Sequence, residues 1–492
     1  MVVNSIAFLL FFVVVFLAYY FPLFKSTPLY QNAILLVASY FFYGYIDYKM
    51  IPLLFGATVA FYLLGNWLKR EMAKEHWKSA SYITTFGVLL GVGVLLYFKY
   101  LNFFIESFAS FFITIGINVS WTTLNIVLPV GVSFFTFKLI SYVIEIHREH
   151  INPSREFLDF AVFIAFFPTI LSGPIDRPNK FLPQLQRFRI FDYNLAVNGC
   201  QQILWGMFTK MCVADNLAVL TDNAWGNIPN QSSSYLLLVA LLYPIQMYAD
   251  FDGYSNMAIG VSKILGIKVA RNFNHPLLAR TVAEYWRRWH MSLTSWITDY
   301  IFMPLNILFR NIGKWGTIFA AIINLIVIGL WHGANWTYGL FGLYHGLLFI
   351  PLVLSGTFGK NKKIKENKNK LPFIEDFLKM VLTYILVAIG LVIFRADSIQ
   401  SLCGFTRAFF DNSFLPFNLS HCISSWSSFF LTLVLTFMIV ILDWTSRKSE
   451  YALYTPSFIN NRCGKILFFA ILFIFINLTA NTTPSQFIYF QF

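Results

Sequence analysis

The sequence predicts an all-α, polytopic integral membrane protein, and three observations support this fold class. Of its 492 residues, 57% are hydrophobic and only 12% are charged, about half of the ~25% that soluble domains carry. The mean hydropathy is +0.62. The apolar runs are long, and 6–24 has the length of a helix that crosses a bilayer core of about 30 Å. A soluble enzyme, a disordered chain and a fibrous protein are excluded.

The apolar runs are interpreted as helices, because a membrane β-barrel would alternate apolar and polar residues over segments of about ten. We expect about 10–13 helices at membrane depth, in a single domain that spans residues 1–492. Two of the runs, 157–173 and 197–219, are also compatible with re-entrant or tilted helices. The expected spans are 5–24, 29–47, 51–68, 82–98, 101–117, 126–144, 157–173, 197–219, 234–263, 317–331, 336–355, 373–394, 427–443 and 464–480.

Two stretches between these runs are not expected to span. In 174–196, three prolines lie among basic residues, which indicates short helices along the membrane surface. The stretch 271–312 is amphipathic and contains most of the clustered polar residues. The first apolar run is too long for a cleavable signal and is interpreted as the first spanning helix.

The net charge of +13 is attributed to cytoplasmic loops rather than to nucleic-acid binding, because no basic stripe alternates with exposed aromatics. Three basic loops are expected in the cytoplasm, which places the N-terminus outside; the second has an alternative as a lipid-headgroup or partner contact. Their basic residues are Lys69, Arg70, Lys74 and Lys78; Lys360, Lys362, Lys363, Lys365, Lys368 and Lys370; and Arg447, Lys448, Arg462 and Lys465.

No metal site is expected. The five cysteines form no C-x-x-C pair, so neither a zinc site nor a disulfide framework is indicated. The histidines His290, His332 and His345 have no acidic or cysteine co-ligand at a suitable spacing. The sequence also contains no phosphate-binding loop, dinucleotide fingerprint or serine-hydrolase elbow.

Ionisable residues inside apolar sequence are costly and therefore indicate function. Asp250 and Asp252 lie in the middle of the apolar run 235–265. Two residues apart, they do not share a helix face. They either form a buried ion pair that positions helices or line a polar cavity.

A second cluster contains Glu284, Arg287, Arg288 and His290. Glu284 and Arg288 have the i, i+4 spacing of a helical ion pair. The two arginines are also candidates to neutralise the aspartates of the first cluster. For His290, a structural role and a catalytic role are equally compatible with the residue type.

A third cluster is Trp331-His332-Gly333-Ala334-Asn335-Trp336, at the end of the apolar run that begins at 318. Burial would keep the imidazole of His332 neutral, with a lone pair that suits a general base. A packed structural histidine is the alternative. Asn335, Trp336 and the indole N–H of Trp331 are candidate donors to an oxyanion.

These clusters resemble the membrane-bound O-acyltransferase (MBOAT) family, and most closely its bacterial branch that contains the alginate O-acetylation membrane protein. The resemblance extends over nearly the whole chain. The matching stretches are SYFFYG (39–44), LPVGVSFFTF (128–137), FFPTILSGPIDR (166–177), DFDGYSNMAIG (250–260), EYWRRWHMSLTSWITDYIFMPL (284–305), GLWHGANW (329–336), GLYHG (342–346), FRADS (394–398) and FIYFQF (487–492).

The resemblance implies a ring of tilted helices around a thinned centre, with a through-tunnel that admits the donor from one face and the acceptor from the other. It assigns the essential catalytic histidine to His332 and the second family histidine to His290. It also places Asp250, Asp252, Arg287 and the further cluster residues Arg288, Trp331, Asn335 and Trp336 at or near the site. The stretch SGPIDR is closer to the teichoic-acid D-alanylation member, and Asn256 stands where the family has an acidic residue.

The function that the resemblance implies is acyl transfer, with acetyl favoured, to a hydroxyl of an extracytoplasmic polysaccharide or cell-envelope glycan. The donor would be acetyl-CoA or an acyl-carrier thioester as substrate, with no bound cofactor. Expected partners are membrane lipid, an extracytoplasmic SGNH-type protein and the polysaccharide, in the bacterial cytoplasmic membrane. The alternatives are D-alanyl or longer acyl transfer to teichoic acid, lipid or a small molecule, and, as a different class, a transporter with a proton relay.

Overall fold

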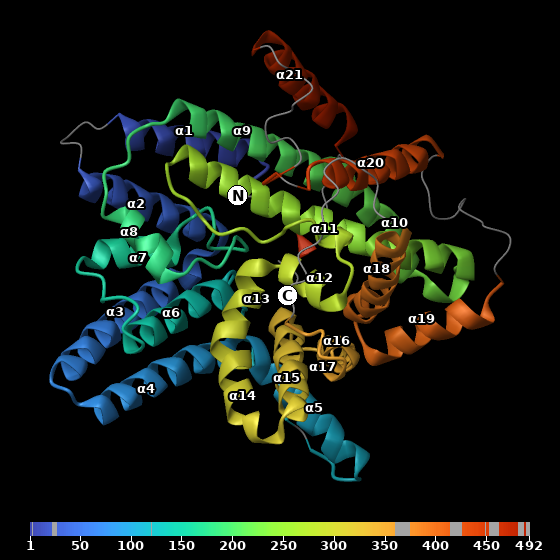
Figure 1. The fold of residues 1–492 in the computed structure, drawn as a ribbon, viewed down its shortest axis with the longest axis horizontal. Helices are drawn as coiled ribbons and strands as arrows, with labels where there is room; N and C mark the ends of the chain where they lie inside the picture. The colour runs from blue at the N-terminus through green and yellow to red at the C-terminus, as the bar shows by residue number, and fades with distance from the viewer. Residues whose placement is uncertain are drawn as a thin grey trace. The chain divides into compact units, whose positions relative to one another are not determined.

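The computed structural model describes residues 1, 3–21, 27–119, 121–359, 374–413, 426–447, 449–451, 462–480 and 487–488. The chain divides into two compact units, residues 1–203 with 257–270 and residues 204–256 with 271–492. The described residues form helices and turns, with no strand. The all-α prediction is therefore confirmed, whereas the expectation of one membrane domain over residues 1–492 stays a prediction. Figure 1 shows the helices in chain order.

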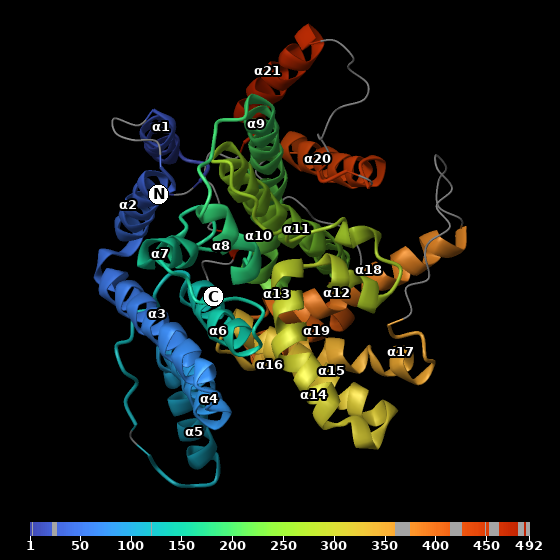
Figure 2. The ribbon, with the colours of Figure 1, turned by 60° about the vertical axis from the view of Figure 1, so that its left-hand side comes forward.

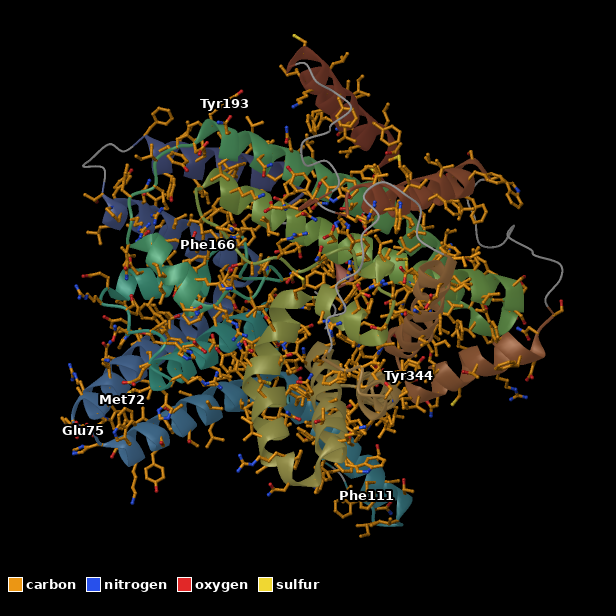
Figure 3. All side chains as sticks on the ribbon, in the orientation of Figure 1. Met72, Glu75, Phe111, Phe166, Tyr193 and Tyr344 are labelled. Atoms are coloured by element: carbon orange, nitrogen blue, oxygen red, sulfur yellow. The ribbon has the colours of Figure 1, made fainter. Side chains whose placement is uncertain are left out.

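The first unit is built from the N-terminal helices. It contains α1 (Ile6–Tyr20), α2 (Pro28–Asp47), α3 (Ile51–Ala73), α4 (Trp77–Leu95), α5 (Leu101–Thr114), α6 (Val132–His147), α7 (Phe157–Ala165) and α8 (Pro178–Leu185). Helices α3 and α4 form a hairpin, which Figure 2 shows edge-on. Met72 and Glu75 mark the tip of that hairpin in Figure 3, and Phe111 projects outward from α5.

A buried, non-helical segment forms the centre of the first unit. Helix α7 ends at Ala165, because Pro168 has no N–H to continue the ladder and disfavours helical backbone before it. The buried Lys138 then donates from Nζ to the carbonyl of Phe163 at 3.2 Å and to the hydroxyl of Thr169 at 3.1 Å. These bonds satisfy a carbonyl that the broken helix leaves without its i+4 partner. The expected span 157–173 is therefore corrected to a short helix and a buried turn.

The second unit contains the polar clusters of the sequence. Helices α9 (Tyr193–Met207) and α11 (Ser233–Ile264) each have residues in both units. The others are α10 (Asp215–Gly226), α12 (Val282–Arg288), α13 (Met291–Ile297), α14 (Met303–Leu308), α15 (Lys314–His332), α16 (Trp336–Leu347), α17 (Ile350–Leu354), α18 (Ile374–Arg395), α19 (Ile399–Asp411), α20 (Trp426–Thr445) and α21 (Arg462–Thr479).

Eight helical segments of the described residues are long and apolar enough to cross a membrane. They are Pro28–Ala73, Trp77–Thr114, Tyr193–Gly226, Ser233–Ile264, Lys314–His332, Trp336–Leu354, Ile374–Arg395 and Trp426–Thr445. Two shorter apolar helices, Ile6–Tyr20 and Cys463–Thr479, accompany them. The chain is thus a multi-pass membrane protein, as the apolar runs predict.

The remaining differences from the expected spans have local causes. The runs 82–98 and 101–117 join into one helical segment through a π-helical turn, Leu96–Tyr100. The run 126–144 begins only at Val132, after Gly131 with φ +75°. The amphipathic helix α19 was not expected, because its composition does not resemble a span. The second basic loop, 360–370, lies outside the described residues, as does Lys448 of the third loop.

Candidate active site

His332 is the last residue of α15, and α16 begins four residues later at Trp336. Gly333 ends α15, and Asn335 begins α16 by accepting a hydrogen bond at Oδ1 from the backbone N–H of Thr337 at 3.1 Å. The Nδ2 of Asn335 donates to the carbonyl of Asp397 at 2.6 Å. The amide of Asn335 therefore caps a helix and fixes the turn that follows His332.

Helices α15 and α16 approach each other closely at two glycines, Gly329 of α15 and Gly342 of α16. A Cβ on Gly329 would lie 2.1 Å from the carbonyl oxygen of Tyr338, and one on Gly342 would lie 2.3 Å from that of Leu325. A side chain at either position would push the helices apart. The two glycines therefore set the distance between the helix that carries His332 and its neighbour.

Aromatic rings surround the imidazole of His332, whose residue is 4% exposed. Its ring centroid lies 4.9 Å from that of Trp331 and 5.1 Å from that of Phe394, both at steep interplanar angles. Apolar rings disfavour an imidazolium because they do not solvate the charge. The environment therefore fits the neutral imidazole that the sequence predicts.

His290 lies in the turn between α12 and α13 with a left-handed backbone, φ +41°. Such a φ is uncommon for a residue with a side chain and persists where its surroundings hold it. Asn272 supplies that support, because its carbonyl accepts from the N–H of Met291 at 2.7 Å and its Oδ1 accepts from the Ser292 hydroxyl at 2.6 Å. Burial lowers the pKa of His290 to about 3, so this imidazole is neutral at physiological pH.

The two histidines lie against the same tryptophan. The ring centroid of Trp331 is 5.6 Å from that of His290 and 4.9 Å from that of His332. Trp331 is 5% exposed, and His290 also contacts Phe251 at 4.7 Å. Although 42 residues separate them in sequence, the fold brings both imidazoles to one buried indole.

Asp250 belongs to a buried ionic cluster. The Nζ of Lys210 lies 2.6 Å from an oxygen of Asp250 and 2.6 Å from one of Asp215. The second oxygen of Asp250 accepts from the backbone N–H of Ile488 at 2.9 Å. Of the two interpretations of Asp250, the structure favours the buried ion pair.

Asp252 lies apart from that ionic cluster, as the spacing of two residues predicts. Its residue is 8% exposed, and its carbonyl accepts from the Nδ2 of Asn256 at 2.9 Å. His275 and Asp443 form a separate contact, with Nδ1 and Oδ1 3.2 Å apart.

The arginines do not neutralise Asp250. Arg288 pairs with Glu284 at 2.7 Å, as the i, i+4 spacing predicts, and also donates to the carbonyl of Asn274 at 3.3 Å. Arg287 is exposed. The predicted site residue Trp336 is also exposed, by 61%. The suggested arginine–Asp250 pair is therefore wrong, because Lys210 is the cation at that carboxylate.

Two further residues, Lys210 and His345, organise this region and were not predicted as site residues. Lys210 is an ionisable residue inside the apolar run 197–219, and the criterion that singled out Asp250 would also have found it. His345 was considered only as a metal ligand. It is fully buried, and its Nδ1 accepts from the indole N–H of Trp286 at 3.3 Å. This bond connects α16 with α12, the helix that leads to His290.

The described residues contain no group of three or more His, Cys, Asp or Glu that is suitable for a metal ion. The expectation of a metal-free site stays a prediction, as do the chemical roles of the candidate site residues. What the structure provides is a pair of buried imidazoles on one indole, supported by a helix cap, a strained turn and a buried ionic cluster. The class of protein is therefore a multi-pass membrane protein with a buried two-histidine centre.

Known proteins identify the family. The sequence model of the membrane-bound O-acyltransferase family matches residues 147–387. The chain is 36% identical over 404 residues to a Pseudomonas aeruginosa protein named "Probable alginate O-acetylase AlgI", covering 81% of this chain and 73% of that protein. It is 28% identical over 416 residues to the peptidoglycan O-acetyltransferase of Helicobacter pylori, covering 77% and 73%. It is 32% identical over 289 residues to the teichoic acid D-alanyltransferase of Bacillus subtilis, covering 55% and 69%.

The chain belongs to the membrane-bound O-acyltransferase family, and it is an O-acyltransferase. The match of 147–387 includes both histidines and the close pair of helices α15 and α16.

Proposed function

We propose that this protein transfers an acetyl group from a thioester donor in the cytoplasm to a hydroxyl of an extracytoplasmic cell-envelope glycan, directly or through a partner. The observation that carries the proposal is the pair of buried imidazoles of His290 and His332 on the indole of Trp331. Relatives named for O-acetylation of alginate and of peptidoglycan support acetyl and glycan as the substrates.

In the proposed reaction, His332 is the general base. Its neutral imidazole takes the proton of the acceptor hydroxyl as the oxygen attacks the thioester carbonyl. The tetrahedral intermediate then collapses, the carbon–sulfur bond breaks, and the proton passes to the leaving thiolate. An ester and a free thiol result, and the imidazole returns to its neutral form.

The developing oxyanion needs a hydrogen-bond donor in a site that excludes water. Of the three candidates, Trp331 is buried against both imidazoles, whereas the amide of Asn335 caps α16 and Trp336 is exposed. These contacts favour the indole N–H of Trp331. His290, neutral and packed against the same ring, would hold that ring in place or contact the donor.

D-alanyl transfer is the second candidate within the family. The relative named as teichoic acid D-alanyltransferase in Bacillus subtilis supports it, together with the stretch SGPIDR at 172–177. The transporter hypothesis is set aside because the chain belongs to an acyltransferase family.

The proposal includes a location and a partner. The positive-inside rule places the basic α3–α4 turn in the cytoplasm of a bacterial inner membrane and the N-terminus outside. Since the acceptor is extracytoplasmic, an SGNH-type protein there is the expected partner for final transfer.

The test measures ester-linked acetate and D-alanine in envelope glycans of cells with the wild-type protein, His332→Ala, or no protein. His76→Ala is the matched control, because His76 is an exposed histidine of the α3–α4 turn that pairs with Glu71. Loss of a general base reduces a rate by about 10²- to 10⁴-fold. We therefore expect ester loss with His332→Ala and in the null, and normal esters with His76→Ala, at equal membrane levels.

The identity of the lost ester distinguishes the candidates. Loss of acetate supports the proposal, and loss of D-alanine supports the second candidate. An unchanged profile in the null refutes an envelope-glycan acceptor. Loss in the null with normal esters in His332→Ala refutes the role of His332.

A further inference from the structure

His345 of α16 lies where two series of aromatic contacts meet. Its imidazole is fully buried, and its ring centroid lies 4.7 Å from that of Phe341 and 5.3 Å from that of Trp286. Phe341 leads to one histidine of the site, because its centroid is 5.2 Å from that of Phe394, which is 5.1 Å from that of His332. Trp286 leads to the other histidine along the chain.

Helix α12 contains Trp286 and positions His290. The helix has seven residues and ends at Arg288, and His290 follows Trp286 by four residues. An isolated helix this short is not stable, so tertiary contacts must fix its position. One such contact is directional, because the indole N–H of Trp286 donates to the Nδ1 of His345 at 3.3 Å. This bond ties the segment before His290 to α16, the neighbour of the helix that ends at His332.

The same hydrogen bond fixes the tautomer of His345. An indole N–H only donates, so Nδ1 is the acceptor and the neutral ring has its proton on Nε2. This Nε2 has no hydrogen-bond partner among the residues that the structure describes. It lies against α18, because a Cβ on Gly390 would be 2.5 Å from it. The imidazole is thus held between the indole of α12 and a glycine of α18.

Stability alone does not explain a histidine at this position. A buried N–H without a partner costs about 1–3 kcal/mol, whereas apolar groups in place of both partners of a hydrogen bond are nearly neutral. Leucine at 345 with phenylalanine at 286 would therefore avoid this cost. An unsatisfied buried group calls for another explanation, and exceptions of this kind are expected at functional sites. What the histidine adds is an acceptor for the indole of Trp286.

We propose that His345 is a positioning residue for acyl transfer. Its Nδ1 holds Trp286 and so fixes α12 against α16, which keeps the imidazole of His290 on the indole of Trp331 that it shares with His332. In this role His345 touches no substrate and acts through Trp286. The inference rests on the proposed function, because it takes the two histidines as the catalytic centre.

The test changes the acceptor in two ways. In His345→Asn the amide oxygen takes the place of Nδ1, whereas His345→Leu fills the space without an acceptor. The assay follows the rate of ester formation in envelope glycans after induction, at equal membrane levels, and the melting temperature of the purified full chain. A displacement of about 1 Å at a reacting group reduces a rate by about 10²-fold. We expect a loss of this size in His345→Leu, and we expect His345→Asn to restore most of the rate.

A further variant removes the donor of the hydrogen bond. Trp286→Phe keeps an aromatic ring but has no N–H, so its rate should fall as in His345→Leu. In the Trp286→Phe background, His345→Asn and His345→Leu should have equal rates, because no donor remains for the acceptor. A role in packing alone would leave the difference between these two variants unchanged.

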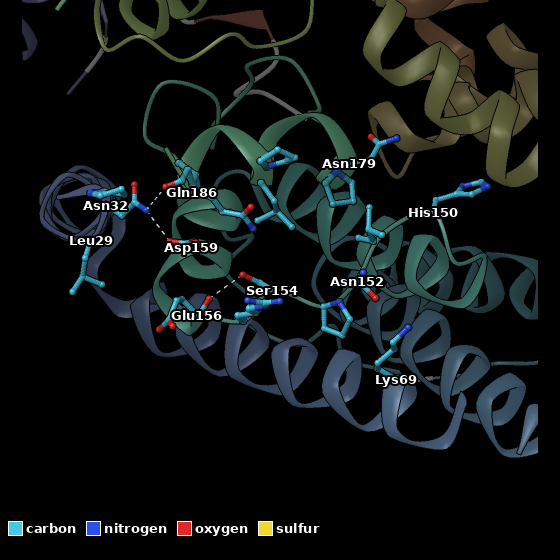
Figure 4. A pocket seen from close by; sticks show the side chains of 18 residues that line it. Leu29, Asn32, Lys69, His150, Asn152, Ser154, Glu156, Asp159, Asn179 and Gln186 are labelled. Carbon is cyan, nitrogen blue, oxygen red and sulfur yellow. Dashed lines mark hydrogen bonds between the residues drawn. The ribbon is translucent and has the colours of Figure 1, made fainter. Parts of the chain in front are cut away.

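Two controls remove hydrogen bonds that do not involve α12. Tyr344→Phe, at the neighbouring position of α16, removes the bond from its hydroxyl to the carbonyl of Leu386 at 2.9 Å. Ser154→Ala removes the bond from its hydroxyl to the carbonyl of Glu156 at 3.0 Å, in the polar groove of the first unit that Figure 4 shows. Both variants should form esters at the wild-type rate.

The outcomes separate this inference from the proposed function. A wild-type rate in His345→Leu, with ester loss in His332→Ala, refutes the positioning role and leaves the proposed function intact. An equal loss in His345→Asn and His345→Leu also refutes it, because the acceptor would then be irrelevant. Normal esters in His332→Ala refute the proposed base, and the positioning role falls with it. If His345→Leu does not reach the membrane, Trp286→Phe decides, since a wild-type rate in that variant refutes the role.

Discussion

The contact of α15 with α16 at Gly329 should be required for activity more than for stability. In a Gly329→Ala variant, the added Cβ would lie 2.1 Å from the carbonyl oxygen of Tyr338. Ordinary van der Waals contact begins at 3.4 Å. The helices must therefore separate by about 1.3 Å to bring the added Cβ to that distance from the carbonyl oxygen. His332 is three residues further along the same helix and would move with it.

The magnitudes differ for folding and for activity. Overpacking costs about 1–3 kcal/mol, whereas alanine in place of glycine within a helix returns about 1 kcal/mol. The net loss of unfolding free energy is therefore about 0–2 kcal/mol. By contrast, a displacement of about 1 Å at a reacting group reduces a rate by about 10²-fold.

Gly339→Ala is the matched control. Gly339 lies in α16, and its added Cβ would only meet a side-chain carbon of Leu330 at 3.6 Å, an ordinary contact. The assay compares ester content and thermal stability of both variants at equal membrane levels. If Gly329→Ala retains the ester content of Gly339→Ala, the inference that this close approach positions His332 is refuted.

Two further predictions concern buried groups of the second unit. Lys210→Met should reduce the free energy of unfolding by about 3–5 kcal/mol, because Asp215 and Asp250 would be left as buried charges without their cation; chemical denaturation of the purified protein measures this loss. The imidazole of His290, whose pKa is lowered to about 3, takes up no proton in the folded state between pH 6.5 and 4, whereas the unfolded chain does. Stability should therefore fall as the pH falls below 6.5, by about 2 kcal/mol at pH 5, and His290→Gln should remove this part of the pH dependence in melting experiments.

Both predictions have a clear contrary result. Lys263→Met is the control for the first, since Lys263 donates to the amide oxygen of Asn198 at 2.8 Å; an equal loss in both variants would contradict the role assigned to Lys210. For the second, a pH dependence that is the same in His290→Gln and in the wild type would show that other groups cause it.

The positions of the long helices could be predicted because burial in lipid requires continuous apolar sequence. The run 234–263 corresponds to α11, Ser233–Ile264, and 373–394 corresponds to α18, Ile374–Arg395. Composition alone determines such segments. Composition does not show that the helix broken by Pro168 after Ala165 is tolerated inside the protein, because Lys138 satisfies the freed carbonyl from a distant helix.

The candidate site could be predicted only in part. His332 and His290 are visible in the sequence as polar residues in apolar or aromatic surroundings. Their approach to Trp331 depends on how α12, α13 and α15 pack, which no local pattern encodes. The same is true of the Lys210–Asp250 pair, since any nearby cation satisfies a buried carboxylate. The sequence does not show that Arg288 pairs with Glu284 and that Lys210 pairs with Asp250.

Full charges and the two imidazoles have different surroundings in the second unit, and this difference supports the proposed role of His332 as a base. Full charges are costly to bury, so the second unit compensates them by direct pairing, as Lys210 does with Asp215 and Asp250. The imidazoles of His290 and His332 lie against aromatic rings. A carboxylate base in such surroundings would itself be protonated or paired, whereas a neutral imidazole keeps its basic nitrogen without a counter-ion. The ionic residues therefore stabilise the packing of the helices. Histidine is the residue type that suits a proton acceptor in these apolar surroundings.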